Sequence, residues 1–297
     1  MKVIDLFCGA GGLSLGFKNA GFTIVAAIDN WDPALRTYQS NFDHPVIKSD
    51  LADINTITGK LKAFKPEIII GGPPCQDFSS AGFRNESTRA NLTVAFAKII
   101  GNLKPSYFVF ENVPLAKYSH SFKEAQRIWK EVGYGLTSIV LDASLCGVPQ
   151  RRKRLFCIGA RYASDGFLER QLQTGYRDPM TVREYCGSSI KVNNYYRHPR
   201  SYKRRAVFSI DEPAPTIRGT NRPVAPGYKG HPRDTAPVAE VRPLTSDERA
   251  LIQTFPPTYI WDVDKRSDKE QLIGNAVPVK LGEYVGNALR EWIQNKE

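Results

Sequence analysis

The sequence predicts an α/β protein with a mostly parallel sheet and a second, smaller domain that is rich in loops. Over roughly the first 160 residues, short apolar runs alternate with segments of helical spacing. That alternation is typical of parallel α/β sheets. From about residue 175 to 245, proline, glycine, tyrosine and arginine become frequent and no sustained period is present. The 297 residues are enough for a large core domain and a smaller partner.

Strands and helices can both be placed from this pattern. Strands are expected at residues 2–7, 23–28, 67–70, 107–110, 137–141 and 154–158. Crossover helices are expected at residues 13–20, 33–41, 92–103 and 122–132, and Pro33 suits a helical first turn. Helical spacing returns at residues 246–255 and 278–293, so we expect the end of the chain to rejoin the first domain.

The composition suits a globular protein with a polyanionic partner. The chain has 41 Lys and Arg against 30 Asp and Glu, a net charge of +11, which favours a partner that carries phosphates. No apolar run approaches the roughly 18 residues that span a bilayer, and Asp5 stands where a signal peptide would be apolar. We therefore expect a protein of the cytoplasm with no membrane partner.

Cysteine usage argues against disulfides and zinc. The five cysteines, Cys8, Cys75, Cys146, Cys157 and Cys186, are an odd number and include no C-x-x-C pair. A disulfide framework needs pairs, and structural zinc sites usually take closely spaced cysteines. We expect at least one free thiol and no metal.

Positive charge is concentrated between residues 191 and 233. This segment holds ten Lys or Arg against two acids, Asp211 and Glu212, and its aromatic residues include Tyr195 and Tyr202. Interleaved bases and aromatics suit a surface that packs on sugars and bases while Arg and Lys hold phosphates. A solvated basic loop is the alternative interpretation.

A glycine-rich turn follows the first expected strand. Residues 5–12 read Asp-Leu-Phe-Cys-Gly-Ala-Gly-Gly and lead into a helix; the glycines permit a tight turn and close approach of a ligand. Such turns hold nucleotide-like cofactors, although dinucleotide sites also use them and some bind nothing. Asp29 ends the second expected strand, where an acid can accept both ribose hydroxyls. A plain surface Asp is the alternative.

Two candidate catalytic residues follow neighbouring strands. Cys75 stands in Gly-Gly-Pro-Pro-Cys-Gln, residues 71–76, just after an apolar strand. Open α/β sheets bind ligands at this edge, so a nucleophile is favoured over the buried small hydrophobe that a lone Cys usually is. Glu111 ends the next strand and should face the same cleft as an acid. A capping or ion-paired Glu is the alternative.

A basic run, residues 150–154, precedes the last expected strand. It reads Gln-Arg-Arg-Lys-Arg, and the alternation of a strand places Arg152 and Arg154 on one face. That face could hold a phosphate or a carbonyl oxygen; a basic surface turn is the alternative.

Six short motifs occur in one order along nearly the whole chain. They are D-x-F-x-G-x-G-G (residues 5–12), P-P-C-Q (73–76), E-N-V (111–113), Q-x-R-x-R (150–154), R-P-L-T to F-P (242–256) and G-N-A-V-P (274–278). In these motifs the chain closely resembles the bacterial DNA cytosine-C5 methyltransferases. The resemblance implies a Rossmann-like, S-adenosylmethionine-dependent methyltransferase fold with a mixed, mostly parallel sheet. It also implies a catalytic domain of residues 1–174 completed by 260–297, and a target-recognition domain of residues 175–259.

The resemblance implies a covalent mechanism. In the family, the target cytosine is rotated out of the duplex, because its C5 and C6 cannot be attacked within the stack. Cys75 would add to C6, and Glu111 would hydrogen-bond N3 and stabilise the charge that enters the ring. Arg154 would contact the cytosine carbonyl, and Arg152 would support the catalytic loop or a phosphate. No metal is required.

The resemblance also implies the residues that bind the ligands. S-adenosylmethionine, which becomes S-adenosylhomocysteine, would be held by Phe7, Gly9, Ala10, Gly11, Gly12, Asp29, Asn30, Asp50, Leu51, Pro74, Leu92, Asn275, Ala276 and Val277. DNA would be bound by Gln76, Ser79, Lys203, Arg204, Arg205 and Arg218. The family often has an apolar residue directly after the ribose acid, whereas Asn30 stands here with Trp31 next, so Trp31 is left out of the expected adenine pocket.

The expected substrate is double-stranded DNA, and the expected enzyme is a monomer associated with the bacterial nucleoid. A restriction endonuclease that cuts the same site is the partner that the family's usual role implies. The tRNA-methylating branch of the family is the nearest alternative, but its Cys-Phe-Thr signature is absent. A catalytically silent DNA-binding relative is a further alternative, against which the presence of Cys75, Glu111 and both arginines argues.

Overall fold

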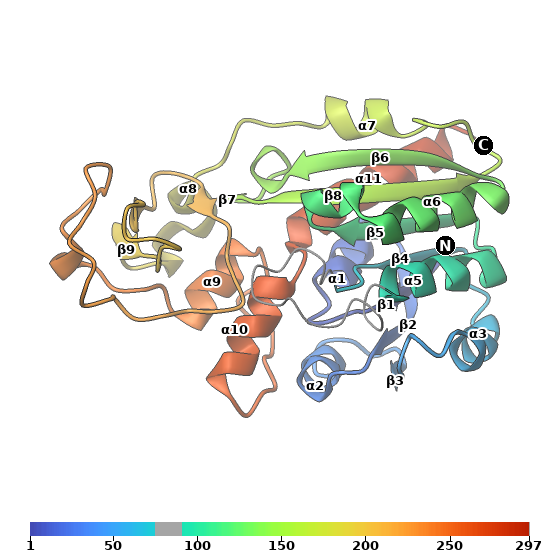
Figure 1. The fold of residues 1–297 in the computed structure, drawn as a ribbon, viewed down its shortest axis with the longest axis horizontal. Helices are drawn as coiled ribbons and strands as arrows, with labels where there is room; N and C mark the ends of the chain where they lie inside the picture. Colours follow the sequence, from blue (N-terminus) through green and yellow to red (C-terminus); the bar gives the residue numbers. More distant parts are fainter. Residues whose placement is uncertain (75–90, 297) are drawn as a thin grey trace.

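The chain forms a twisted seven-stranded sheet covered by helices, seen in the computed structural model of Figure 1, which describes residues 1–74 and 91–296. The strand order is β3-β2-β1-β4-β5-β8-β6. The strands are β1 (Lys2–Leu6), β2 (Thr23–Asp29), β3 (Val46–Lys48), β4 (Ile68–Gly71), β5 (Tyr107–Asn112), β6 (Tyr134–Asp142) and β8 (Lys153–Arg161). The predicted fold class, a mixed and mostly parallel sheet, is confirmed.

Only β8 runs against its neighbours. The pairs among β1 to β5 are parallel, whereas β8 is antiparallel to both β5 and β6. A parallel crossover needs a dozen or more residues, usually with a helix. The link between β6 and β8 holds only residues 143–152, so the chain turns back and pairs antiparallel.

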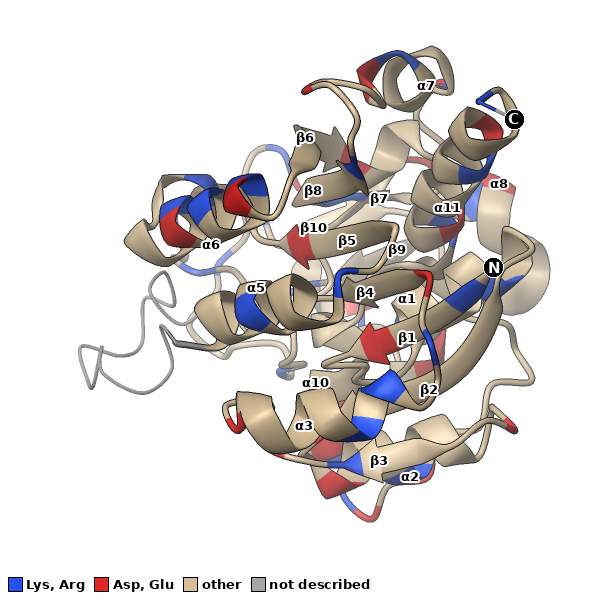
Figure 2. Ribbon diagram, turned by 90° about the vertical axis from the view of Figure 1, so that its right-hand side faces the viewer, with Lys and Arg blue, Asp and Glu red and all other residues tan. Residues whose placement is uncertain are grey.

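The strands bury both faces, and alternate residues serve opposite helix layers. Val3, Ile68 and Val109 belong to one apolar cluster with helices α1 (Gly12–Asn19), α7 (Glu169–Thr174) and α11 (Val279–Gln294). Ile4 and Phe108 belong to another, with α3 (Ile54–Lys62), α5 (Asn91–Leu103) and α6 (His120–Glu131). Figure 2 shows α5 and α6 on one side of the sheet and α7 and α11 on the other. Burial on both faces explains why the strands are continuous apolar runs.

The sequence pattern did not predict several short or polar elements, including the six-residue α7. Strand β3 has only three residues, α3 contains several residues of low helix propensity, and α10 (Arg266–Asn275) is predominantly polar. The predicted helix at 246–255 is shorter, because α9 ends at Ile252. The other predicted strands and helices of the core are present with boundaries that differ by a few residues.

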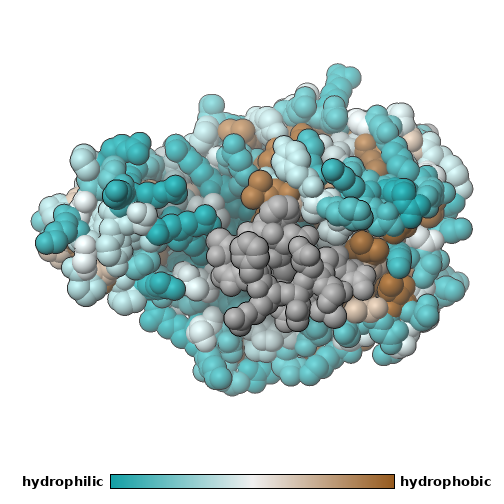
Figure 3. Space-filling view, in the orientation of Figure 1, coloured by the Kyte–Doolittle hydropathy of each residue, from teal (hydrophilic) through white to brown (hydrophobic). Residues whose placement is uncertain are grey.

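The segment of residues 175–245 is loop-rich and lies at one end of the molecule, on the left in Figure 1. Its elements are α8 (Val182–Cys186), β9 (Asn194–Tyr196), β10 (Val207–Ser209) and β11 (Ala214–Pro215), which pairs with β7 (Gln150–Arg151). Two short 3-10 helices, η3 (Gly187–Ser189) and η4 (Val238–Glu240), also lie in this segment. The remaining elements belong to the first part of the chain: helix α2 (Asp32–Gln39) and the 3-10 helices η1 (Pro114–Tyr118) and η2 (Ala143–Leu145). In Figure 3 this end of the surface is largely hydrophilic.

The apolar core of this end is small. One cluster of four buried residues, Tyr196, Ala206, Ala225 and Tyr228, lies within it, while its other buried residues join a cluster shared with α2, α9 and α10. Polar contacts therefore hold many of its loops. Within residues 1–74 and 91–296, no helix has the length and apolar character needed to cross a membrane.

Gly274, in α10, is expected to be intolerant of a side chain. A Cβ there would lie 2.1 Å from the backbone carbon of Arg218 and 2.1 Å from the nitrogen of Gly219. We expect Gly274→Ala to lower the free energy of unfolding by about 3 kcal/mol, measured by urea titration. The matched control is Gly59→Ala in α3, where nothing lies within 4 Å of the added carbon. Equal stability of the two variants would contradict the close packing at Gly274.

Candidate active site

A cavity of about 610 Å³ opens at the carboxyl ends of β1, β2, β4 and β5. Ligands of open α/β sheets bind at this edge. The predicted cofactor residues that line it are Phe7, Gly9, Ala10, Gly12, Asp29, Asn30, Asp50, Leu51, Pro74, Leu92, Asn275, Ala276 and Val277. Of the predicted cofactor residues, only Gly11 does not line it.

The glycine-rich turn supplies the floor of this cavity. Phe7 has a φ of 60°, a left-handed conformation that is strained for an aromatic residue and is found mostly at functional sites. At Gly9, with φ 52°, nothing lies within 4 Å of an added Cβ, which leaves open space beside the backbone. At Gly12 a Cβ would lie 2.2 Å from the carbonyl oxygen of Val277. Glycine therefore lets the turn and residues 275–277 meet as two walls of one cavity.

Gly11 serves the fold of the turn. Its φ is 78°, and an added Cβ would meet the rings of Phe42 and Tyr38 and the hydroxyl of Tyr259. Its open side is filled by aromatic side chains, so its contribution is the left-handed turn itself.

Asp29 is held in place by backbone amides. Its Oδ2 accepts from Gly9 N at 2.9 Å, and its Oδ1 accepts from Asn30 N at 2.8 Å and Trp31 N at 3.0 Å. Burial raises the pKa of Asp29, against the lowering effect of these hydrogen bonds. Trp31 was left out of the adenine pocket expected from the sequence, yet it also lines the cavity. The turn that follows Asp29 brings Trp31 to the cavity wall.

Asp5 lies at the inner end of a hydrogen-bonded chain that local sequence patterns do not predict. Its carboxylate accepts from the Ser14 hydroxyl at 2.7 Å, Ser14 Oγ accepts from Tyr38 at 2.7 Å, and Tyr38 lies 2.9 Å from His44 Nε2. Asp5 also lines the cavity. Burial raises the pKa of Asp5 to about 7; the Ser14 hydrogen bond lowers it and the Asp29 charge raises it further.

Glu111 and Arg154 form an ion pair in the same cavity. Arg154 Nε lies 3.0 Å from Glu111 Oε1, and the two side chains are 14 % and 10 % exposed. Burial raises the pKa of Glu111, and the charges of Arg154 and Arg152 oppose that rise. Burial and the two arginines therefore act on the pKa of Glu111 in opposite directions, and the ion pair with Arg154 orients its carboxyl group.

Gly72 leaves room for the Glu111 carboxylate. A Cβ at Gly72 would lie 2.8 Å from Glu111 Oε2. Asn112, next to Glu111, donates from its amide to the Pro73 carbonyl at 3.1 Å. These contacts fix the end of β4 beside the end of β5. Cys75, Gln76 and Ser79, three of the predicted site residues, follow Pro74 and lie outside the described residues.

Arg152 is buried and joins separate chain segments by hydrogen bonds; it does not line the cavity. It is 1 % exposed and donates to the carbonyls of Ile217 at 2.9 Å, Gly274 at 2.8 Å and Ala276 at 3.1 Å. Alternation along the strand does bring both arginines near Glu111. The phosphate contact suggested for Arg152, however, would need a guanidinium that is already occupied by backbone oxygens.

Gln150 reinforces this tie. Its amide donates to the side chain of Gln253 at 2.7 Å and accepts from Ile217 N at 2.9 Å. Gln253 in turn donates to the carbonyls of Ile273 and Ala276. The Q-x-R part of the motif, in β7 and the residue that follows it, therefore joins the start of β8 to α10 and the loop-rich segment.

The predicted DNA-binding bases have different environments. Lys203 and Arg204 are exposed. Arg205 is ion-paired with Glu212 and lies over the Phe208 ring, 4.4 Å from its centroid, so a phosphate would have to compete for it. Arg218 lines a second cavity, of about 270 Å³.

The described residues contain no group of three or more His, Cys, Asp or Glu side chains placed to hold a metal ion. The four cysteines in this part of the chain, Cys8, Cys146, Cys157 and Cys186, are free and buried. Burial raises the pKa of the Cys157 thiol to about 12, so this sulfur is a poor nucleophile.

The sheet order, the glycine turn and the acid at the end of β2 define an enzyme class that holds a nucleotide-like cofactor beside a buried glutamic acid. A family model described as C-5 cytosine-specific DNA methylase matches residues 1–198 and 168–291. The chain belongs to this family, and its activity is methyl transfer to C5 of cytosine in DNA. Its methyl donor is S-adenosylmethionine.

Two curated relatives are similar to this chain over nearly its full length. The chain is 52 % identical over 295 residues to the type II methyltransferase M.HgiDI of Herpetosiphon aurantiacus, covering 99 % of this chain and 95 % of that one. It is 51 % identical over 293 residues to M.HindV of Haemophilus influenzae, covering 97 % and 96 %. Among solved structures, S. pombe Dnmt2 matches with a TM-score of 0.74 at 17 % identity, covering 99 % of each chain. That likeness shows the fold alone.

Glu111→Gln is expected to lower methyl transfer about a thousandfold, because an amide keeps the shape but cannot donate an acidic proton to the base. Cofactor affinity should stay within about threefold. Tritium transfer from labelled S-adenosylmethionine to DNA measures the first, and calorimetry measures the second. The control is Glu124→Gln, on the exposed surface of α6 and ion-paired with Arg127. Transfer within threefold of the native rate in the Glu111 variant would rule out the acid role.

Asp5→Asn is expected to change how stability depends on pH. The pKa of Asp5 is about 7 in the fold against 3.8 for a free side chain, so the folded state binds more protons between these values. Stability should therefore fall as pH rises through this window, by about 4 kcal/mol from this group. The variant should lose that slope in urea unfolding at pH 5 to 8.

The matched control for this measurement is Asp53→Asn. Asp53 is exposed, and its pKa is lowered by its cap hydrogen bond to Thr56. Its contribution is lost only as pH falls through the acid range, so the control should keep the native slope above pH 5. Parallel curves for native protein and Asp5→Asn would contradict the raised pKa.

Proposed function

We propose that this enzyme methylates a cytosine in a specific double-stranded DNA sequence through a covalent bond between Cys75 and C6 of the base. We further propose that it is the modification enzyme of a restriction and modification system. The observation that carries the mechanism is the ion pair of Glu111 and Arg154 inside the cofactor cavity, beside the prolines that lead to Cys75. The names of the curated type II relatives support the biological role.

The target base has to leave the DNA stack before it can react. Attack on C6 requires access to the face of the ring, which stacking covers. We propose that the Cys75 thiolate forms a bond to C6 and pushes an electron pair toward C5. Glu111 donates a hydrogen bond to N3, which stabilises the charge that enters the ring.

Arg154 orients this acid and the base. Its Nε holds Glu111 Oε1 at 3.0 Å, and its side chain lines the cavity, from where its guanidinium can reach the cytosine carbonyl. Burial lowers the pKa of Arg154, and the Glu111 charge opposes this. A pair exposed to so little water interacts strongly, so the carboxyl group stays fixed as the base arrives.

The cavity suits S-adenosylmethionine. The open space at Gly9, the acid at Asp29 and the aromatic ring of Trp31 fit an amino acid joined to a nucleoside. When bound, the cofactor supplies the methyl group that the C5 electron pair takes, and S-adenosylhomocysteine is left. Loss of the C5 proton to water then lets the C6 bond to Cys75 break, which restores the aromatic ring. None of these steps needs a metal.

The remaining assignments concern partners and place. We propose that Lys203, Arg204, Arg205 and Arg218 contact DNA in a target-recognition domain of residues 175–259, together with Gln76 and Ser79 from the segment after Cys75. The enzyme would act as a monomer in the bacterial cytoplasm, at the nucleoid. An endonuclease that cuts the unmethylated site would be its partner.

Cys75→Ala is expected to abolish methyl transfer, because Cys8 is the one cysteine of residues 1–74 and 91–296 that lines the cavity, and burial raises the pKa of its thiol. Bisulfite sequencing of plasmid DNA from expressing cells should show a methylated sequence context with native protein and none with the variant. Cofactor binding by calorimetry should be unchanged. The control is Cys146→Ala, at the C-cap of η2, a residue that does not line the cavity. Retained transfer in Cys75→Ala would exclude the covalent mechanism, and activity on tRNA without activity on DNA would exclude the proposed substrate.

A further inference from the structure

A second cavity lies between two stretches of the loop-rich segment and is lined by arginine. We call these stretches the two arms: residues 195–200 and residues 217–222. Its volume is about 270 Å³. The lining comes from residues 195–200, from Ile217, Arg218 and residues 220–222, and from Leu244 and Arg249. Five of these residues are arginines, and no Asp or Glu is among the described residues that line it. This cavity is separate from the cofactor cavity, since the two share no lining residue.

Arg197, Arg200, Arg218 and Arg222 converge on the cavity without an acidic partner among the described residues, whereas Arg249 is paired with Glu270. Burial lowers the pKa of Arg197 to about 10, and the nearby charges of Arg218, Arg200 and Arg249 contribute to the lowering. Burial also lowers the pKa of Arg218, with contributions from Arg200 and Arg204. Within the part of the chain that is described, the side chains of Arg200 and Arg222 make no hydrogen bond or ion pair and are exposed. The like charges repel one another, so an anion in their midst would relieve a cost that the fold already bears.

Two of the arginines are fixed by the backbone. Arg197 donates to the Thr216 carbonyl at 2.8 Å, and Arg218 donates to the His198 carbonyl at 3.3 Å. These contacts tie the two arms together across the cavity. The hydroxyl of Tyr195, which is 2 % exposed and belongs to the lining, has no hydrogen-bond partner among the described residues.

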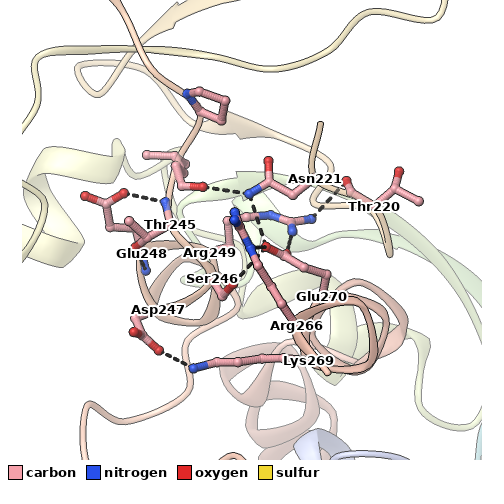
Figure 4. Close-up of polar contacts among 12 residues, drawn as sticks. Thr220, Asn221, Thr245, Ser246, Asp247, Glu248, Arg249, Arg266, Lys269 and Glu270 are labelled. Atoms are coloured by element: carbon pink, nitrogen blue, oxygen red, sulfur yellow. Dashed lines mark hydrogen bonds and ion pairs between the residues drawn. The ribbon is translucent and has the colours of Figure 1, made fainter. Parts of the chain in front are cut away.

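The arm that carries Arg218 and Arg222 is anchored by a buried ion pair between α9 and α10, drawn in Figure 4. Arg249 and Glu270 are each 5 % exposed. Arg249 donates to the backbone carbonyls of Arg218 and Thr220. The buried pair therefore holds the backbone of this arm, while the side chains of Arg218 and Arg222 line the cavity.

The Asn221 side chain completes this anchor. It donates to the Leu244 carbonyl at 2.7 Å and to Glu270 Oε1 at 3.1 Å. Glu270 Oε1 also accepts from the Ser246 hydroxyl at 2.8 Å. The arm therefore has a fixed backbone, and the cavity is a built feature of the fold.

We propose that this arginine-lined cavity binds one phosphodiester group of the DNA backbone. A phosphodiester carries the negative charge that the cavity lacks, and the planar donors of arginine suit its oxygens. A neutral base edge would accept hydrogen bonds but would leave the repulsion among the arginines in place. The proposal rests on the proposed function, because it takes duplex DNA as the substrate.

The test uses a double variant, Arg200→Gln with Arg222→Gln, since neither side chain has a partner among residues 1–74 and 91–296 and the fold should be kept. DNA binding is measured by fluorescence anisotropy over a range of salt, on a duplex that bisulfite sequencing has shown the native enzyme to methylate. We expect affinity to fall about tenfold and the slope of log K against log salt to fall by about 0.9, the value for one phosphate. The control, Arg233→Gln, removes a charge from the same segment outside the cavity and should alter both values much less.

A second measurement identifies the phosphate directly. Each phosphate of the duplex is replaced in turn by a neutral methylphosphonate. One position is expected to weaken binding by the native enzyme about tenfold and to have no further effect on the double variant. Additive effects at every position would overturn the proposal.

Two other outcomes would also overturn it. Equal losses in the double variant and in Arg233→Gln would mean a diffuse basic surface. A change of the methylated sequence with an unchanged salt slope would mean that the cavity contacts a base. If the native enzyme methylates no DNA at all, the proposed function fails as well, and that result is distinguished by the first bisulfite experiment.

Discussion

The arrangement of this enzyme depends on one buried guanidinium. Arg152 donates to three backbone carbonyls, one before the Arg218 arm and two at the end of α10. Removing an arginine from water lowers its pKa well below the usual range, and the burial of Arg152 is offset by the carbonyl oxygens that accept from both of its terminal nitrogens. The wall of the cofactor cavity and the start of the basic arm are therefore fixed to β8 by the same side chain.

Strand β8, which begins directly after Arg152, carries the second arginine into the cavity. Arg152 is turned to the backbone, and two residues later Arg154 meets Glu111. Glu111 is balanced between burial, which favours its neutral form, and two arginine charges, which favour its ionised form. The ion pair with Arg154 keeps the carboxyl group oriented. In the proposed mechanism this carboxyl group donates a hydrogen bond to N3 of the bound base.

The loop-rich end is organised by polar contacts because its apolar core is small. Its segments are held by hydrogen bonds to backbone carbonyls and by the buried pair of Arg249 and Glu270. A buried ion pair contributes little net stability, yet breaking it is costly, so it specifies one loop geometry. This is a suitable base for a surface whose arginines repel each other until an anion binds.

The sequence determined the sheet, because strands buried on both faces are apolar runs and their helices have a clear period. It also determined which residue types follow β1, β2, β4 and β5, and the carboxyl ends of parallel strands meet at one edge. The weakly patterned β3, α3 and α10 escaped prediction, since tertiary packing, and not local pattern, forms them.

Only the tertiary structure decided the partners. Arg152 and Arg154 are alike in sequence, but one is enclosed by carbonyls from distant segments and the other faces Glu111. Hydrogen bonds connect Asp5 to His44 through Ser14 and Tyr38. Trp31 lines the cofactor cavity, and five arginines line the second cavity. These features depend on contacts between residues far apart in the chain, which local spacing does not specify.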